Sequence, residues 1–182
     1  MSLSMPSYAP TIETPRLRLR AHRRDDLAPC LALWSDPEVT RFIGQVSSEQ
    51  QTWARLLTNV GHWALMGFGY WVMELPSSNR FVGEVGFADF HRDIADSMRG
   101  VPELGFALTP EFHGHGYATE GARAVLNWAD TNLDADRTVC LINERNSASV
   151  RVAAKIGYRV FDRAIVKGEP TLLLERSRPT YS

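Results

Sequence analysis

The sequence predicts one domain of the α/β class, more specifically α+β, in which a mixed, mostly antiparallel central sheet of about seven strands is flanked by about four helices. Two observations favour this fold. Between residues 70 and 108 three strand candidates follow one another, as in an antiparallel meander. After residue 110 helical and strand patterns alternate, as in strand–helix crossovers. The predicted order of elements is β-α-α-β-β-β-α-β-α-β-β.

The first part of the chain predicts one strand followed by two helices. Residues 16–20 alternate between arginine and leucine, as a half-buried strand does. An aspartate at 25 or 26 is placed to cap a helix that Pro37 ends. A serine at 47 or 48 opens a second helix, which closes near Gly67.

The rest of the chain supplies the remaining strands and two further helices. A helix with a continuous apolar stripe begins near Tyr117. Asn146 caps a shorter helix that runs to Ile156, and Gly157 is placed to end it in the left-handed conformation. Strands are predicted at residues 70–75, 81–90, 101–108, 138–142, 158–166 and 171–175.

Composition indicates an ordinary globular protein. The chain has 182 residues, of which 44% are hydrophobic and 23% charged, and a formal net charge of −1. Without a basic excess, neither a nucleic acid nor a membrane surface is the expected partner. No apolar run approaches the roughly 20 residues of a membrane span, and no signal peptide is evident. We expect a single domain at residues 14–177, a partly disordered N-terminal extension at 1–13 and a C-terminal tail at 178–182.

The cysteine and histidine pattern does not predict a metal site. Cys30 and Cys140 belong to no Cys-x-x-Cys or Cys/His ligand spacing, so buried free thiols and a cytoplasmic location are expected. His113 and His115 resemble a metal-binding pair only in isolation, because no third ligand is marked nearby.

The segment His113-Gly114-His115-Gly116-Tyr117-Ala118-Thr119-Glu120 carries the clearest functional signal. It lies between a predicted strand and the start of a predicted helix. Two glycines at such a junction leave backbone N–H groups uncovered at the positive end of the helix dipole, where an anion binds well. The segment therefore predicts a phosphate site, although an ordinary strand-to-helix turn would share its spacing.

Three classes of phosphate site were compared. The P-loop pattern of mononucleotide-binding NTPases is absent. A dinucleotide fingerprint would find two of its glycines at Gly114 and Gly116 and an acidic residue at Asp134. However, Thr119 stands where its third glycine belongs, and the turn follows a meander instead of the first strand of a β-α-β unit.

The third class is the one that the surrounding sequence favours. From Thr14 to Glu175 the chain resembles the GNAT superfamily of N-acetyltransferases, specifically its RimJ/RimL-like branch. The phosphate-binding pattern of that family maps onto His113, Gly116 and Ala118, with histidine at the first position in place of the commoner glutamine or arginine. Other segments that match the branch in order are 14–17, 35–39, 82–86, 103–106, 143–149 and 155–158.

The resemblance implies acetyl-CoA as co-substrate, held between the central strand and the strand that follows the long helix. It implies that the strand ending at Leu108 bulges and so frees backbone groups for the pantetheine arm, while the turn binds the pyrophosphate. The cofactor-binding residues implied in this way are Phe106, Ala107, Leu108, His113, Gly114, His115, Gly116, Tyr117, Ala118 and Asn146.

The chemistry of acetyl transfer to an amine then suggests catalytic residues. A protonated amine cannot attack a thioester, so a base is needed, and Glu103 resembles the usual carboxylate position of the family. Glu84 and His91 are reserve bases. Many relatives carry a tyrosine at the position of Ala153 as general acid; here Ser149, where the branch carries a serine, is assigned that role.

Two hypotheses of different classes follow. The first is an enzyme that transfers acetyl directly, in a ternary complex, to a primary amine, either a protein N-terminus or a small molecule. The second is a non-catalytic acyl-CoA-binding or regulatory module on the same fold, suggested by the missing tyrosine. The resemblance also suggests a homodimer, which no sequence feature establishes.

Overall fold

A computed structural model describes residues 8–179. Its strands form one sheet in the order β1-β2-β3-β4-β5-β6-β8-β7, and every neighbouring pair is antiparallel except β5 and β6. This confirms the predicted mixed, mostly antiparallel sheet. The strands are β1 (Ile12–Glu13), β2 (Arg18–Arg20), β3 (Tyr70–Leu75), β4 (Arg80–Ala88), β5 (Glu103–Leu108), β6 (Arg137–Asn143), β7 (Arg159–Val166) and β8 (Glu169–Ser177).

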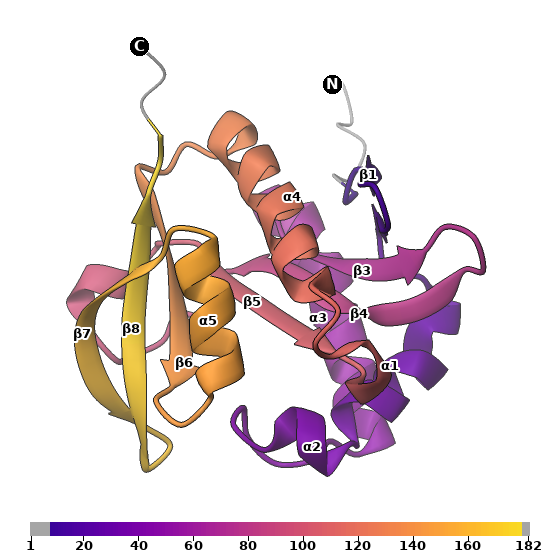
Figure 1. The fold of residues 1–182 in the computed structure, drawn as a ribbon, viewed down its shortest axis with the longest axis horizontal. Coiled ribbons are helices and arrows are strands. Elements are labelled where there is room, and N and C mark those ends of the chain that lie inside the picture. The colour runs from indigo at the N-terminus through magenta and orange to yellow at the C-terminus, as the bar shows by residue number, and fades with distance from the viewer. Residues whose placement is uncertain (1–7, 180–182) are drawn as a thin grey trace.

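Helices cover both faces of the sheet. In Figure 1, α4 and α5 cross in front of the strands, whereas α1 and α3 lie behind them. The α-helices are α1 (Leu27–Trp34), α2 (Pro37–Thr40), α3 (Glu49–Met66), α4 (Tyr117–Asn132) and α5 (Ser147–Lys155). Three short 3₁₀ helices, at Arg24–Asp26, Pro110–Phe112 and Asp96–Met98, lie in the connections. None of the helices among residues 8–179 is long and apolar enough to cross a bilayer.

Local signals set the ends of several helices as predicted. Ser48 accepts a hydrogen bond from the N–H of Gln51, and the Gln51 side chain accepts one in return from the N–H of Ser48, which completes a capping box at α3. Gly67, at φ +72°, ends α3, and Gly157, at φ +93°, follows α5. These positive φ values are readily adopted by glycine because it has no Cβ.

Two local predictions were wrong or incomplete. Asp26 precedes α1 but makes no capping hydrogen bond, because its carboxylate is drawn back to the guanidinium of Arg20 and the N–H of Arg23. Pro37 does not simply end a helix; it is the first residue of α2, which Asp36 caps through the N–H of Glu38 at 2.7 Å. The short strand β1 lies within the predicted N-terminal extension. Residues 1–7 of that extension and 180–182 of the predicted tail lie outside the described residues.

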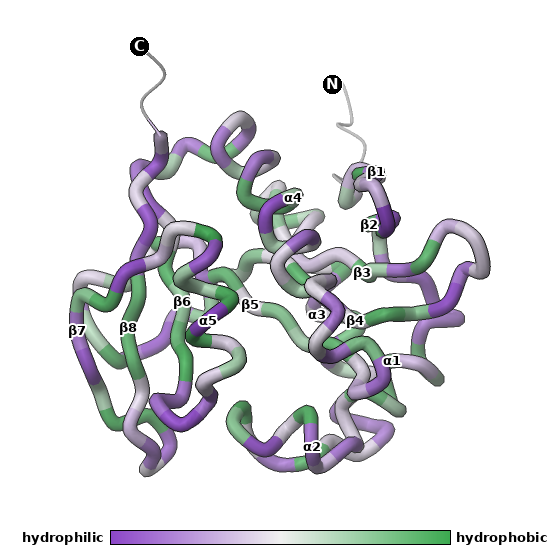
Figure 2. Tube along the Cα trace, viewed as in Figure 1, coloured by the Kyte–Doolittle hydropathy of each residue, from purple (hydrophilic) through white to green (hydrophobic). Residues whose placement is uncertain are grey.

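The largest core lies between the sheet and α4. Figure 2 shows hydrophobic stretches along central strands such as β4 and β5, and buried residues of the helices complete the core. Trp63, Trp71 and Trp128 meet there in mutually edge-to-face contacts with ring centroids 4.6 to 5.3 Å apart. Three elements, α3, β3 and α4, are tied together by this aromatic cluster.

The functionally important feature of the sheet is the separation of β5 and β6. All six residues of β5 pair with β4, but only Glu103 pairs with β6, through Val139. Beyond Glu103 the two parallel strands diverge, as Figure 1 shows. The edge of β5 that faces β6 is therefore left without a strand partner from Leu104 to Leu108, and α4 and α5 both begin near this opening.

Candidate active site

The glycine turn after β5 has the backbone geometry of an anion site. Gly114 and Gly116 adopt the left-handed conformation, at φ +78° and +82°, and Gly116 is the N-cap of α4 without any side-chain capping bond. The backbone N–H groups of residues 114–119 donate to no acceptor among the described residues. Six consecutive unsatisfied donors at the positive end of a 16-residue helix suit a phosphate group.

The N-terminal segment before β2 supports this turn. The carboxylate of Glu120, in the first turn of α4, accepts hydrogen bonds from the Thr14 hydroxyl and from the N–H and Nε of Arg16. Arg16 also donates to the carbonyl of His115 at 2.9 Å, and its guanidinium lies 4.5 Å from the ring centroid of Tyr117. Burial works against ionisation, but the bonds from Thr14 and Arg16 hold the pKa of Glu120 below its usual value.

The two histidines of the turn differ in their contacts. The His113 ring donates from Nε2 to the carbonyl of Leu108 at 2.9 Å, and its Nδ1 lies 3.6 Å from the carboxylate of Glu38. The His115 ring lies near Tyr117 in an edge contact, with centroids 6.4 Å apart. His113 therefore connects the turn back to the end of β5, a role for which the sequence offers no local signal.

The bulge expected in β5 is absent. The register of β5 against β4 is continuous from Glu103 to Leu108, and the irregularity of β4 falls instead on its other side, opposite β3. Backbone groups of Phe106 are exposed to the opening because β6 diverges, not because β5 is distorted. Those expected to be free at Ala107 face β4 instead, where Ala107 pairs with Glu84 and its carbonyl lies beside Gly83. The carbonyl of Leu108, also expected to be free, already accepts the bond from His113.

Glu103 stands at the start of β5, where the two strands part. Its side chain is only 12% exposed, and both carboxylate oxygens accept hydrogen bonds from Arg92, at 2.8 and 3.1 Å. Burial raises the pKa of Glu103 above its usual value, and Arg92 reduces this rise without cancelling it. A carboxylate with a raised pKa at an open strand edge is suited to accept a proton near neutral pH.

The two reserve bases lie in very different environments. Glu84 is buried beneath α1, where its oxygens accept from His22 Nε2 and Trp34 Nε1, both at 2.6 Å. Burial opposes ionisation, yet these contacts hold the pKa of Glu84 below its usual value. His91 is 88% exposed beside Asp89. Glu84 is thus a closed structural carboxylate, and His91 lies on an exposed loop.

The buried cluster around Glu84 also brings together three groups that can bind metals. Donor atoms of His22, Cys30 and Glu84 lie within 4.8 Å of one another. However, His22 and Glu84 are already hydrogen-bonded at 2.6 Å, which leaves no room for an ion between them at the ~2.0 Å bond lengths of a zinc site. Cys30 donates to Glu84 at 3.6 Å, and burial raises the pKa of its thiol. The cluster fits a hydrogen-bonded core better than a metal centre.

Asn146 and Ser149 open α5, as the sequence predicts. The Asn146 side chain accepts a hydrogen bond from the N–H of Ser149 at 3.1 Å, so the capping role of Asn146 is confirmed. Both residues are half-buried at the start of the helix that follows the diverging strand β6. Ala153, where many relatives carry a tyrosine, is fully buried in the core.

Two contributions to the site were missed in the sequence. Arg92 lies in the loop between β4 and β5, and nothing in its local pattern connects it with Glu103. The contact of Arg16 with Glu120 joins two segments that the resemblance had marked separately. Arginine and glutamate at these positions are typical surface residues, so only the tertiary structure identifies their pairing.

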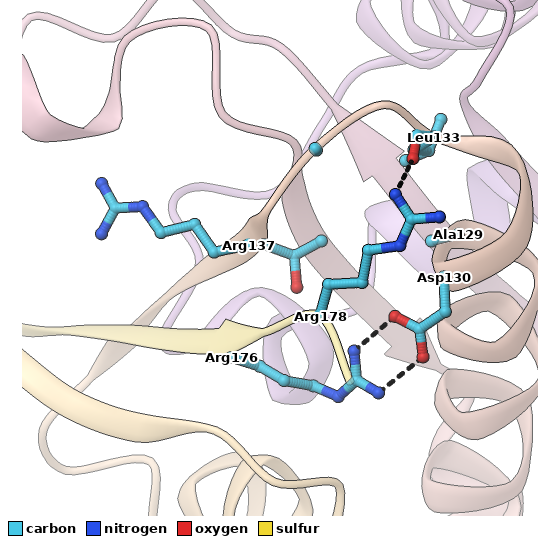
Figure 3. A pocket seen from close by; sticks show the side chains of 8 residues that line it. Ala129, Asp130, Leu133, Arg137, Arg176 and Arg178 are labelled. Carbon is cyan, nitrogen blue, oxygen red and sulfur yellow. Dashed lines mark hydrogen bonds and ion pairs between the residues drawn. The ribbon is translucent and has the colours of Figure 1, made fainter. Parts of the chain in front are cut away.

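Two hollows on the described surface lie away from this site. Figure 3 shows one at the C-terminal end of α4, with a volume of about 10 Å³, close to that of one water. Its arginines are engaged: Arg176 with Asp130 at 2.7 Å and Arg178 with the carbonyl of Leu133 at 3.3 Å. A larger groove of about 640 Å³ lies between the starts of α1 and α3, and none of the predicted site residues lines it.

Comparison with known proteins identifies the family of the chain. Residues 16–159 match the family model described as acetyltransferase (GNAT) domain. The chain is 30% identical over 165 residues to the uncharacterized protein YkkB of Bacillus subtilis. The aligned region covers 90% of this chain and 93% of that protein.

Solved structures agree with this assignment. A putative GnaT-family acetyltransferase from Bordetella pertussis superposes with a TM-score of 0.84 at 27% identity, over 93% of this chain and 100% of that one. RimL, a ribosomal L7/L12 α-N-protein acetyltransferase solved with coenzyme A, shares the fold at a TM-score of 0.75 and 18% identity, over 92% of this chain and 98% of its own. The chain therefore belongs to the GNAT family of acetyltransferases, whose members use acetyl-CoA.

Proposed function

We propose that the chain is an acetyl-CoA:amine N-acetyltransferase of the RimJ/RimL-like branch, in which a primary amine attacks the acetyl thioester directly in a ternary complex. One observation carries the proposal: β5 begins with Glu103, keeps one edge unpaired, and ends at a turn with six unsatisfied N–H groups. A base, an open strand edge that can bind an extended ligand, and an anion site thus follow one another along a single strand and its turn.

Within this proposal the turn and the open strand hold acetyl-CoA. The pyrophosphate binds to the backbone N–H groups of the turn, at Gly114, His115, Gly116, Tyr117 and Ala118. Phe106 presents its backbone groups and Leu108 its N–H to the pantetheine arm, Ala107 contributes only as part of the strand, and Asn146 contributes from the start of α5. The catalytic domain in this proposal spans residues 14–177.

Glu103 is the proposed general base. It takes a proton from the amine nitrogen as the new N–C bond forms, and the C–S bond of the thioester breaks as CoA leaves. Ser149, in the first turn of α5, is proposed to return a proton to the departing thiolate. Because a thiolate leaves readily at neutral pH, loss of this proton donor costs less than loss of the base.

The acceptor is proposed to be a protein N-terminus or a small primary amine. The similarity in fold to RimL, which acts on ribosomal L7/L12, supports the first class. Action in the cytoplasm is supported by two buried free thiols, Cys30 and Cys140. A homodimer is also proposed, from the resemblance alone.

A non-catalytic acyl-CoA-binding module is the second candidate. It is favoured by the buried Ala153 in place of a tyrosine acid and by the engagement of both Glu103 oxygens with Arg92. This candidate predicts acetyl-CoA binding without turnover on any amine.

The deciding experiment is a screen that follows acetyl-CoA-dependent thiol release with peptide N-termini and small amines side by side. Turnover that falls about 100-fold or more in Glu103→Gln supports the enzyme and its base. Glu175→Gln is a matched control, since it removes another arginine-paired carboxylate, on β8. Tight acetyl-CoA binding with no thiol release on any amine favours the module, and full turnover by Glu103→Gln refutes the base.

A further inference from the structure

The hydroxyl of Tyr70 lies against β5, although Tyr70 belongs to β3. Tyr70 pairs with Gly86 of β4, and Gly86 pairs with Gly105 of β5, so the three residues form a row across three strands. A Cβ added at Gly105 would lie 2.0 Å from the Tyr70 hydroxyl oxygen and 3.1 Å from its Cζ. The tyrosine side chain therefore reaches across β4 and ends beside the α-carbon of Gly105.

Two glycines make this path available. A Cβ at Gly86 would lie 2.4 Å from the α-carbon of Tyr70, and one at Gly105 would displace the hydroxyl. Neither glycine has a positive φ, so their backbone conformation does not require glycine. What they provide is space, as glycine in a strand often does where another group approaches closely.

The Tyr70 hydroxyl lies on the face of β5 that carries the proposed base, Glu103. Side chains alternate along a strand, so Glu103, Gly105 and Ala107 share one face. Glu103, Arg92, Arg55 and Glu84 are the charged groups whose fields reach the hydroxyl. Burial, with a further contribution from Glu103, raises the pKa of Tyr70, so the hydroxyl stays protonated through neutral pH.

No hydrogen bond within residues 8–179 involves the Tyr70 hydroxyl, and it is not one of the fully buried atoms without a partner, so it is reachable from outside the protein. By contrast, the hydroxyl of Tyr158 is bonded to Thr138 Oγ1 at 2.5 Å, and the indole N–H groups of Trp34, Trp63 and Trp71 all find acceptors. A phenol hydroxyl can both donate and accept a hydrogen bond. The open edge of β5 beside it is where an external partner would bind.

We propose that Tyr70 binds the acceptor: its hydroxyl oxygen accepts a hydrogen bond from the amine nitrogen and holds that nitrogen at β5, beside Glu103. The inference rests on the proposed function, because it assumes an amine that reacts at this strand. Holding the nitrogen in line with the thioester lowers the entropic cost of attack, so Tyr70 acts on the acceptor and not on acetyl-CoA. Nothing in the local sequence marks this residue, since a strand-initial tyrosine is ordinary.

Tyr70→Phe tests the proposal, because phenylalanine keeps the ring over Gly86 and removes only the hydroxyl. For an amine that the wild type acetylates, kcat/KM is expected to fall about 10- to 100-fold, with most of the change in the KM of the amine. The Kd of acetyl-CoA, measured by calorimetry, is expected to stay within twofold of wild type. Tyr158→Phe is the matched control: it removes a bonded hydroxyl, so Tm falls while the kinetics of the amine stay unchanged.

The possible outcomes separate the two levels of inference. If Tyr70→Phe keeps kcat/KM within twofold, Tyr70 does not bind the acceptor, and the proposed function stands. If Tyr70→Phe instead loses acetyl-CoA affinity or stability, and that loss accounts for its lower kcat/KM, the role of Tyr70 is structural and the inference is wrong. If the wild type acetylates no amine, the proposed function fails and takes this inference with it.

Discussion

Arg16 and Glu120 form an ion pair of 2.7 Å although 104 positions separate them in the chain. The pair fastens the segment before β2 to the first turn of α4, and Arg16 also bonds the carbonyl of His115 inside the glycine turn. An ion pair whose arginine is 46% exposed adds little to stability by itself. Its position suggests that it instead fixes the direction in which the N–H groups of the turn point.

Glu120→Gln is therefore expected to weaken acetyl-CoA binding more than it weakens the fold. The loss of a partly exposed ion pair corresponds to about a fivefold increase in Kd, which isothermal calorimetry can measure. Glu13→Gln is the control, because it removes a more exposed glutamate that pairs with Arg18 away from the turn. Equal Kd values for the two variants would contradict a positioning role for Glu120.

Gly114→Ala tests the conformation of the turn. Gly114 has φ +78°, and a Cβ there would meet nothing within 4 Å, so alanine adds backbone strain of about 1–2 kcal/mol without any clash. If the backbone relaxes, the N–H groups turn away from the anion, and the Kd of acetyl-CoA is expected to rise at least about tenfold.

Gly168→Ala is the matched control for this substitution. Gly168 lies between β7 and β8, at φ +82°, and a Cβ there also meets nothing within 4 Å. Urea denaturation should show a similar loss of stability in both variants, with acetyl-CoA affinity kept in Gly168→Ala. If both variants lost acetyl-CoA affinity, the strain in Gly114→Ala would act by destabilising the whole fold and not by reorienting the N–H groups of the turn.

Arg92→Gln tests Glu103 as the base through the pH dependence of kcat/KM. Arg92 opposes the rise in the pKa of Glu103 that burial causes, so removal of its charge raises that pKa further. A base must be deprotonated to act, so the acidic limb of the profile should move to higher pH. Arg99→Gln, on the same loop but paired with Asp93, should leave the limb in place. A limb that stays fixed in Arg92→Gln would argue against Glu103.

Glu84→Gln separates a structural carboxylate from a catalytic one. It disturbs a buried, hydrogen-bonded pair with His22, so we expect a loss of about 3 kcal/mol at pH 7, measured by denaturant unfolding with tryptophan fluorescence. The kinetics of the folded variant should match wild type. A 100-fold loss of turnover in a variant that is still folded would show that Glu84, the reserve base, takes part in the reaction.

The stabilising effect of Glu84, measured as the difference between wild type and Glu84→Gln, should depend on pH. Because the pKa of Glu84 is lowered in the folded state, its ionised form stabilises the fold above the unfolded-state pKa of about 4.3. This contribution is lost as the pH falls toward the folded-state pKa. The difference in unfolding free energy between wild type and Glu84→Gln should therefore shrink from pH 7 to pH 3, and a constant difference would contradict it.

Local chemistry made much of the fold predictable. The start of α3 near Ser48, its end near Gly67, the left-handed Gly157 and the N-cap at Asn146 depend on neighbours within a few residues, and these were predicted correctly. The cap at Asp26 was not, because Arg20 competes for its carboxylate across a contact between elements. Local rules fail where a distant partner offers a stronger bond.

The sequence by itself determined the order of the elements, apart from β1 and α2, and the glycine turn, since hydrophobic periodicity and the unsatisfied N–H groups of a helix start are properties of contiguous residues. Only the tertiary structure decided that β5 and β6 part after Glu103, that Arg92 holds Glu103, and that Tyr70 crosses Gly86 to reach Gly105. These relationships depend on strand register and on charges brought together by folding. Neither is encoded in the spacing of nearby residues, so the anion site could be read from the sequence and the surroundings of the base could not.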